Sequence, residues 1–268
     1  MLLEGRLGLA PVQSPEYVLD IATGTGIWAL EYADQNPKSK VVGTDLSRIQ
    51  PSPWVTNCSF ERENSEMAEW LFPYKFDYIH LRAVLTCFDD ITTVIKKSFD
   101  HMNAGGYIEF MDPGAPAFER WNELFAKGAA AIGRDMPRTR LYKDYLFETG
   151  FVDVVERLVP MPINPWPPDP GFKQMGRFGE QNMLKVIDSL RKLTGLAGLT
   201  PEATEELIAQ AKREIGDRRN HTYFPWYVVY ARKPHPWETR DMDTDAWAPG
   251  RKIPTEEIHA GKGKQVVP

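Results

Sequence analysis

The sequence predicts an α/β fold built around a largely parallel sheet, and three features lead to that prediction. Short apolar stretches that suit buried strands alternate with stretches of helical periodicity from Tyr17 to Pro160. A glycine turn at 22–26 joins the first of these strands to the first helix. Two further helical segments, at about 113–140 and 161–222, interrupt the alternation. Alternating strands and helices are typical of a parallel sheet that carries helices on both faces.

The strands are placed by apolar runs that end at turn residues, and the helices by the helical repeat between them. We expect strands at Tyr17–Ile21, Lys40–Asp45, Ser59–Glu63, Phe76–Leu81, Gly106–Met111, Phe151–Pro160 and Trp226–Lys233. We expect helices between them at Ile27–Asn36, Thr92–Met102 and Leu141–Thr149. Gly150 follows the last of these helices at a position that favours a helix stop.

The two interrupting segments have the pattern of helical insertions. Apolar residues at helical spacing predict helices at Ala117–Ile132, Glu180–Leu193 and Pro201–Ile215. Thr200 precedes the last of them as a favourable helix start. Both insertions lie near the carboxyl ends of parallel strands, where open sheets bind ligands, so we interpret them as a substrate cap. Structural padding is the alternative.

Composition excludes several classes of protein. The net charge of -5 and the pI of about 5.6 disfavour direct nucleic-acid binding, because phosphate neutralisation needs clustered Lys and Arg. No apolar run is long enough to span a membrane, and the N-terminus has no secretory signal pattern. Cys58 and Cys87 lack metal-site spacing, so we expect free thiols, no metal site and a cytoplasmic location. Residues 235–268 are rich in proline, glycine and charge and predict an irregular tail.

The stretch Val18–Trp28, VLDIATGTGIW, carries the strongest functional signal. Its strand leads into Gly24 and Gly26, which let a ligand approach the backbone at the start of a helix. These glycines also satisfy the loose pattern of dinucleotide-binding turns. Asp20 would repel a pyrophosphate, but it suits the ammonium and sulfonium groups of S-adenosylmethionine (SAM). The bulky pair Ile27-Trp28 at the helix start also favours SAM over NAD.

Asp45 ends the second predicted strand, where it is placed to accept hydrogen bonds from ribose hydroxyls. It suits SAM and NAD alike, so it indicates a nucleoside ligand without choosing between them. A strand-turn-helix unit without a ligand is the structural alternative, and an NAD-dependent dehydrogenase is a minor functional one.

An acid, a glycine turn and a second acid in this order resemble the class I SAM-dependent methyltransferases. Three blocks look like the fungal LaeA-type members of that group: TGTGIW at 23–28, IHLR at 79–82 and GGYIEF at 105–110. Later blocks of the same members are similar to WPPDP at 166–170 and YFPWYVVYARKP at 223–234. The resemblance covers about residues 3–234. Ala22 departs from it, because this group usually has glycine there.

The resemblance implies a Rossmann-like class I methyltransferase fold, with a seven-stranded sheet whose last strand is antiparallel, plus the helical cap insertions. It implies a methyltransferase domain over 1–234, followed by the tail at 235–268. The chain starts close to the first strand, so we expect an upstream helical segment that is usual in the family to be missing.

The predicted SAM contacts combine this resemblance with the chemistry of the residues. Leu46 is expected to pack beside adenine, and Asn64 to bond the adenine edge through an amide that both donates and accepts. A plain turn residue is an equal alternative for Asn64. The full predicted set is Asp20, Ala22, Thr23, Gly24, Gly26, Asp45, Leu46, Asn64 and His80.

His80 and Arg82 are the predicted catalytic residues. In an in-line methyl transfer the enzyme positions the nucleophile and can remove its proton. His80 lies at the end of the fourth strand, and an imidazole titrates near neutrality. A histidine that only orders the pocket is the alternative. Arg82 is expected to hold an acidic substrate or to pair with an acid, and either Glu109 or Asp112 to face the substrate.

Three functional hypotheses follow. The first is a SAM-dependent methyltransferase that modifies O or N of a small, apolar organic molecule in fungal secondary metabolism, since the cap segments are rich in aromatic residues. The second, implied by the LaeA resemblance, is a regulator that acts with protein partners in the nucleus. The third is an enzyme of this fold that catalyses a cyclisation or isomerisation. The expected partners are a small molecule and either a protein or a second copy of the chain, without nucleic acid or membrane.

Overall fold

A central sheet organises the computed structural model, which describes residues 3, 5–114, 124, 127, 128, 130, 131, 136–189, 191–238 and 256–257. Its strands are β1 (Tyr17–Ile21), β2 (Lys40–Asp45), β3 (Cys58–Arg62), β4 (Phe76–Arg82), β5 (Met102–Pro113), β6 (Val152–Pro162), β7 (Tyr223–Arg232) and β8 (Glu256–Glu257). The helices are α1 (Ile27–Gln35), α2 (Ile91–Asp100), the 3-10 helix η1 (Met136–Leu141), α4 (Tyr142–Thr149), α5 (Pro170–Ser189), α6 (Arg191–Leu196) and α7 (Pro201–Gly216).

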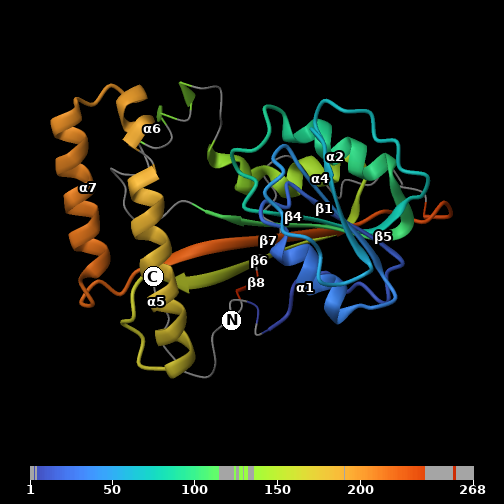
Figure 1. Ribbon diagram of the computed structural model, residues 1–268, viewed down its shortest axis with the longest axis horizontal. Helices are drawn as coiled ribbons and strands as arrows, with labels where there is room; N and C mark the ends of the chain where they lie inside the picture. The colour runs from blue at the N-terminus through green and yellow to red at the C-terminus, as the bar shows by residue number, and fades with distance from the viewer. Residues whose placement is uncertain are drawn as a thin grey trace.

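The strands lie in the order β3-β2-β1-β4-β5-β7-β6-β8 (Figure 1). Neighbouring strands pair in parallel except at β7, which is antiparallel to both β5 and β6. The Rossmann-like sheet is therefore confirmed, with the seven predicted strands present and the last of them antiparallel. β8 adds a two-residue strand beside β6 within the tail, where the sequence predicts irregular structure.

The cap helix α5 begins at Pro170, and the prediction of a start at Glu180 is wrong. The sequence does not predict the first half of this helix, because it contains glycines and glycine disfavours helix interiors. The structure shows why they are there: a Cβ at Gly176 or Gly179 would lie 2.1 or 2.3 Å from a carbonyl oxygen of the chain that leaves β6. The backbone of α5 therefore crosses the end of β6 at a distance that only glycine permits.

Two strands also begin well before their predicted starts. β7 begins at Tyr223 rather than Trp226, because its first residues pair with an equally extended end of β6. β5 begins at Met102, which the sequence assigns to the end of a helix, because Met102 already pairs with Phe76 of β4. Most of the predicted helix Ala117–Ile132 lies outside the described residues.

Helices cover the two faces of the sheet unequally (Figure 1). α2 and α4 lie on one face, over a large apolar core that includes Ile79 and Phe110. α1 lies on the opposite face, where Trp28 packs with Tyr78. Since strand side chains alternate between faces, His80 lies on this α1 face with Tyr78. The face that carries Asp20, His80 and Glu109 is thus also the face of α1.

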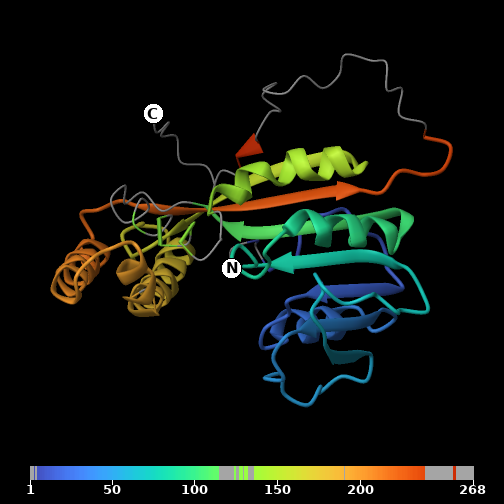
Figure 2. The same ribbon diagram turned by 90° about the horizontal axis from the view of Figure 1, so that it is seen from above.

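The helices α5, α6 and α7 are set apart beyond the carboxyl end of β6 (Figures 1 and 2). α5 and α7 enclose a small core with the loop after β6, formed by Ile163, Met183, Ile187, Ile208, Ala211 and Ile215. Asn164 joins the loop after β6 to α7, because its Nδ2 donates to the Ile215 carbonyl at 3.0 Å. None of the described helices is long and apolar enough to cross a bilayer.

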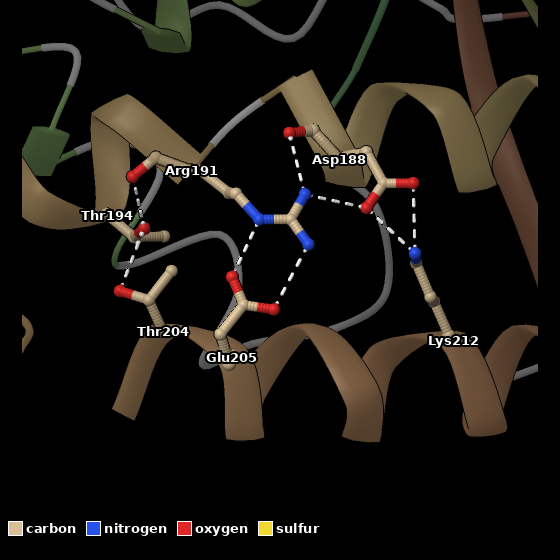
Figure 3. Close-up of polar contacts among 6 residues, drawn as sticks. All are labelled: Asp188, Arg191, Thr194, Thr204, Glu205 and Lys212. Carbon is tan, nitrogen blue, oxygen red and sulfur yellow. Dashed lines mark hydrogen bonds and ion pairs between the residues drawn. The ribbon is translucent and has the colours of Figure 1, made fainter. Parts of the chain in front are cut away.

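A polar cluster connects the three cap helices at the surface (Figure 3). Arg191 of α6 bonds Glu205 of α7 through two nitrogens, at 2.7 and 3.1 Å, and Asp188 of α5 at 2.8 Å. Lys212 of α7 reaches the same Asp188 at 2.7 Å. Because these groups are exposed, we expect them to orient the helices more than to stabilise them.

Asp112 ties β5 to two other elements on the α2 and α4 side of the sheet. It is fully buried, and its carboxylate accepts hydrogen bonds from the Val84 amide at 2.6 Å and the Tyr142 hydroxyl at 2.5 Å. The Val84 contact holds the loop after β4, where Ala83 adopts a left-handed φ of 57°. Burial raises the pKa of the Asp112 carboxyl to about 6.

The close crossing of α5 and β6 predicts a large difference between two glycine substitutions. We expect Gly179→Ala to lower the free energy of unfolding by about 1–3 kcal/mol, because its Cβ meets backbone that cannot move aside. Gly195→Ala in α6 is the matched control, since no atom lies within 4 Å of its Cβ and alanine favours helices. Urea denaturation measures both, and equal stabilities of the two variants would contradict this packing.

The buried Asp112 predicts a pH dependence of stability. Its folded-state pKa of about 6 lies above the ordinary 3.8, so its contribution is fully present below about pH 3.8 and is lost as the pH rises through 6. The pKa difference corresponds to about 3 kcal/mol. We expect Asp112→Asn to remove this fall from pH 4 to 6 in urea denaturation, whereas the exposed control Asp100→Asn retains it. A wild-type pH slope in Asp112→Asn would refute the assignment.

Candidate active site

The turn between β1 and α1 is held in a left-handed conformation at three of its five residues. Ala22, Gly24 and Gly26 have φ values of 55°, 59° and 77°. The amide of Thr23 donates to the Thr44 carbonyl of β2 at 2.9 Å, which anchors the turn to the neighbouring strand. Alanine at position 22 accepts a conformation that costs an L-residue about 1 kcal/mol, which explains why glycine is expected there.

The two glycines of the turn have different roles. A Cβ at Gly26 would lie 2.4 Å from the Phe60 ring, so this glycine lets β3 pack against the start of α1. A Cβ at Gly24 would meet no atom within 4 Å, so the backbone there borders open space. Gly26 is also the N-cap of α1 and provides no side-chain cap, which leaves the N–H groups of the first turn available to a ligand.

Asp45 lies at the edge of this turn. Its Oδ2 accepts a hydrogen bond from the Gly24 amide at 2.9 Å, and its Oδ1 accepts one from the Ser47 amide at 2.8 Å. Each carboxylate oxygen retains a further acceptor site for a hydroxyl group. Leu46 follows and is 56% exposed, which leaves an apolar surface beside the carboxylate.

Asp20 and His80 form a buried pair behind the turn. Strands β1 and β4 place them directly opposite each other, and His80 Nδ1 lies 2.8 Å from Asp20 Oδ1. The Thr23 hydroxyl donates to the other oxygen of Asp20. His80 is fully buried, its ring stacks on Trp28 at a centroid distance of 3.6 Å, and its Nε2 has no partner among the described residues. Because a carboxylate oxygen accepts, Nδ1 of His80 is the donor to Asp20.

Glu109 of β5 extends this row of polar side chains by one strand. It pairs in register with His80 and is fully buried. Its carboxylate accepts hydrogen bonds from the Leu9 and Ala10 amides, at 2.9 and 2.6 Å, and from the Tyr78 hydroxyl at 3.1 Å. Burial raises the pKa of the Glu109 carboxyl, although His80 and these hydrogen bonds act against the rise.

Two predicted residues lie away from this cluster. Asn64 is exposed, and its Oδ1 accepts from the amides of Glu66 and Met67 at 3.1 and 3.2 Å, as a turn residue does. Arg82 is exposed at the carboxyl end of β4. Within the described part of the chain its guanidinium has no ion pair, so it is available to a ligand at that edge.

The structure thus brings the predicted residues into two adjoining groups. Asp20, Thr23 and His80 form the buried group, and the turn residues with Asp45 and Leu46 form the open one. Sequence reasoning missed Trp28 as the stacking partner of His80, and it did not foresee that Glu109 binds the N-terminal backbone. A polar residue in the apolar strand β5 was an available signal for Glu109, but the sequence gives no signal for its partners Leu9 and Ala10.

These residues fit SAM on structural grounds. Gly24 borders open space, the start of α1 is uncapped, and Asp45 has acceptor capacity for a ribose beside the apolar Leu46. Asp20 supplies a negative charge near the place where an ammonium or sulfonium group would lie. Among the described residues, no three His, Cys, Asp or Glu side chains are grouped to hold a metal ion.

Comparison with known proteins identifies the family of the chain. A family model described as a methyltransferase domain matches residues 3–154. The chain is 29% identical over 250 residues to methyltransferase pytC of Aspergillus terreus, covering 87% of this chain and 77% of that protein. It is 30% identical over 250 residues to the secondary metabolism regulator laeA of Fusarium oxysporum f. sp. lycopersici, covering 85% of this chain and 79% of that protein.

Among solved structures, the fold resembles phosphoethanolamine N-methyltransferase 2 of Haemonchus contortus, with a TM-score of 0.54 and 18% identity. That match covers 84% of this chain and spans half of the other chain, 50% of its length. At this identity the likeness concerns the fold alone. Since the family model covers more than half of the chain and includes the turn and both acids, the protein belongs to the class I SAM-dependent methyltransferases, in the group that contains the fungal LaeA-type proteins.

Proposed function

We propose that the protein transfers a methyl group from SAM to an oxygen or nitrogen of a small, apolar organic molecule in fungal secondary metabolism. The observation that supports this most is the position of the turn 22–26. It opens at the carboxyl edge of the sheet, at the end where β6 leads into the helices α5–α7 (Figure 1). We further propose that residues 1–234 are the methyltransferase domain, with the insertions at about 113–140 and 161–222 as its cap.

The cofactor half of the site follows from the geometry of the acids. Asp45 accepts the ribose hydroxyls and Leu46 packs on adenine, while Ala22, Thr23, Gly24 and Gly26 shape the turn. Asn64 contributes the nitrogen of its amide to the adenine edge, because its oxygen already caps a turn. Asp20 attracts the positive end of SAM, and His80 holds Asp20 in place. SAM supplies the electrophilic methyl group on its sulfonium sulfur.

The acceptor half depends on Arg82. Its exposed guanidinium lies two residues beyond His80 on the same face of β4, at the open edge of the sheet. A guanidinium binds and stabilises an oxygen that carries negative charge, so it favours an acceptor with an acidic hydroxyl or carboxyl group. His80 is closed off by Trp28, so in this arrangement it orders the cofactor acid, and Arg82 meets the acceptor.

Methyl transfer itself is tested with radiolabelled SAM and a panel of apolar fungal metabolites that carry hydroxyl, carboxyl or amine groups. Label in a small-molecule product supports the proposal. A product that forms without consumption of SAM would instead indicate a cyclisation or isomerisation. Binding of SAM with no labelled product across the panel would count against a small-molecule acceptor.

A second candidate function is regulation of secondary metabolism with protein partners, in the nucleus rather than the cytoplasm. The 30% identity to a laeA regulator favours it, and the net charge of -5 disfavours direct contact with DNA. Deletion of the gene followed by transcript analysis tests it. Unchanged transcripts of metabolite clusters, together with no co-purifying protein, would exclude it.

The role of Asp45 predicts a selective loss of cofactor binding. We expect Asp45→Asn to weaken SAM binding about tenfold in calorimetric titration, because an amide cannot accept on both sides as the carboxylate does. Asp34→Asn on the exposed side of α1 is the matched control and should bind SAM with the wild-type Kd. An unchanged Kd in Asp45→Asn would remove Asp45 from the site.

The division between cofactor and acceptor halves predicts that substitutions at Arg82 and at His80 affect different ligands. We expect Arg82→Gln to raise the KM for the acceptor about tenfold or more while leaving the Kd for SAM unchanged, because a charged hydrogen bond is lost. We expect His80→Gln to weaken SAM binding instead. Steady-state kinetics and calorimetry separate the two, and a common effect on SAM alone would place Arg82 in the cofactor half.

A further inference from the structure

The N-terminal strap, defined as residues Leu7–Ala10, lies directly on the buried polar row of the site. A Cβ at Gly8 would lie 2.4 Å from the Tyr78 hydroxyl and 3.0 Å from Glu109 Oε2, so the strap backbone touches both side chains. Leu7 and Ala10 also pack at the edge of the core that contains Trp28. The strap therefore lies on the α1 face of the sheet, against side chains of β4 and β5.

Glu109 is the residue that fastens this strap. Its carboxylate accepts hydrogen bonds from the amides of both Leu9 and Ala10, which lie 100 and 99 residues before Glu109 in the chain. The Tyr78 hydroxyl is its third donor. A buried carboxylate with three donors is well satisfied, and charge-assisted hydrogen bonds of this kind are stronger than neutral ones.

The strap in turn holds the side chain that stacks on His80. Trp28 Nε1 donates to the Leu7 carbonyl at 2.8 Å, and the Trp28 ring lies parallel to the His80 ring, at an angle of 5°. His80 then holds Asp20. Glu109 thus contacts the strap, the strap contacts Trp28, and Trp28 contacts His80. His80 in turn lies opposite Glu109, because β4 pairs with β5.

We propose that Glu109 is a positioning residue for SAM binding: by fastening the strap it keeps Trp28 on His80, and it thereby fixes Asp20 in the orientation that receives the cofactor. The role rests on SAM binding by this site and is independent of which acceptor is methylated. Glu109 itself is not expected to touch the cofactor. It acts only through the strap.

Asp77, in the neighbouring strand β4, offers a matched comparison with Glu109. Its Oδ2 accepts from two successive backbone amides of the N-terminal region, Glu16 at 2.8 Å and Tyr17 at 3.0 Å. Its Oδ1 accepts from Asn103 Nδ2 at 2.8 Å. The chemistry thus repeats that of Glu109, but at the amino end of β4, away from the turn. Loss of Asp77 should cost stability without disturbing Asp20 or His80.

The test compares Glu109→Gln with Asp77→Asn in the full chain. Calorimetric titration with SAM and S-adenosylhomocysteine gives the Kd, thermal unfolding gives Tm, and hydrogen-exchange mass spectrometry follows the backbone amides. We expect Glu109→Gln to raise the Kd for SAM about tenfold and to speed exchange at Leu9 and Ala10. We expect Asp77→Asn to lower Tm and to speed exchange at Glu16 and Tyr17, with the Kd unchanged.

Gly8→Ala is the second variant, because it displaces the strap while keeping the Glu109 carboxylate, and it is expected to raise the Kd in the same way. A wild-type Kd for SAM in Glu109→Gln or in Gly8→Ala, despite faster exchange at Leu9 and Ala10, overturns the proposal. An equal rise in Asp77→Asn also overturns it, since a general loss of stability would then explain the effect. Failure of the wild-type protein to bind SAM or S-adenosylhomocysteine would instead overturn the proposed function.

Discussion

The hydrogen bond between Asp20 and His80 is the contact on which the rest of the site depends. Both side chains are buried, and a buried carboxylate without a partner would cost on the order of several kcal/mol. The contact exists because β1 pairs with β4 in a register that sets the two residues opposite each other. The order of strands therefore decides the electrostatics of the site. Trp28 then covers the His80 ring, and burial of the pair strengthens its hydrogen bond.

In contrast to the buried pair, the open part of the site is exposed and only partly hydrogen-bonded. Asp45 stays half-exposed and Leu46 largely exposed, and the backbone at Gly24 borders open space. Here the protein satisfies only part of the acceptor capacity of the carboxylate, so a ligand can add hydrogen bonds without breaking existing ones. A rigid, buried half and an open half together give a site that is organised before its cofactor arrives, which reduces the entropy cost of binding.

The cap helices are structurally independent of this cofactor site. Among the residues that the structure describes, their apolar core shares no residue with the two large cores that line the sheet, and their contact with β6 depends on glycines that let two backbones touch. Such a layer can change in shape without disturbing Asp20 or Asp45. This separation is consistent with relatives that include both a methyltransferase and regulators on one fold, because function is carried by sites and not by the fold alone.

The sequence by itself determined β1, β2, the glycine turn and the acids Asp20 and Asp45 near the ends of these strands, because apolar runs and glycines are local signals. It also indicated His80, through its place after an apolar strand core. Only the tertiary structure decided that His80 is sealed beneath Trp28, that Asn64 caps a turn and that α5 starts at Pro170. Glu109 is the clearest case, since its partners Leu9 and Ala10 lie about a hundred residues away. Contacts between such distant segments leave no periodic pattern in the sequence, so they emerge only when strand order brings the segments together.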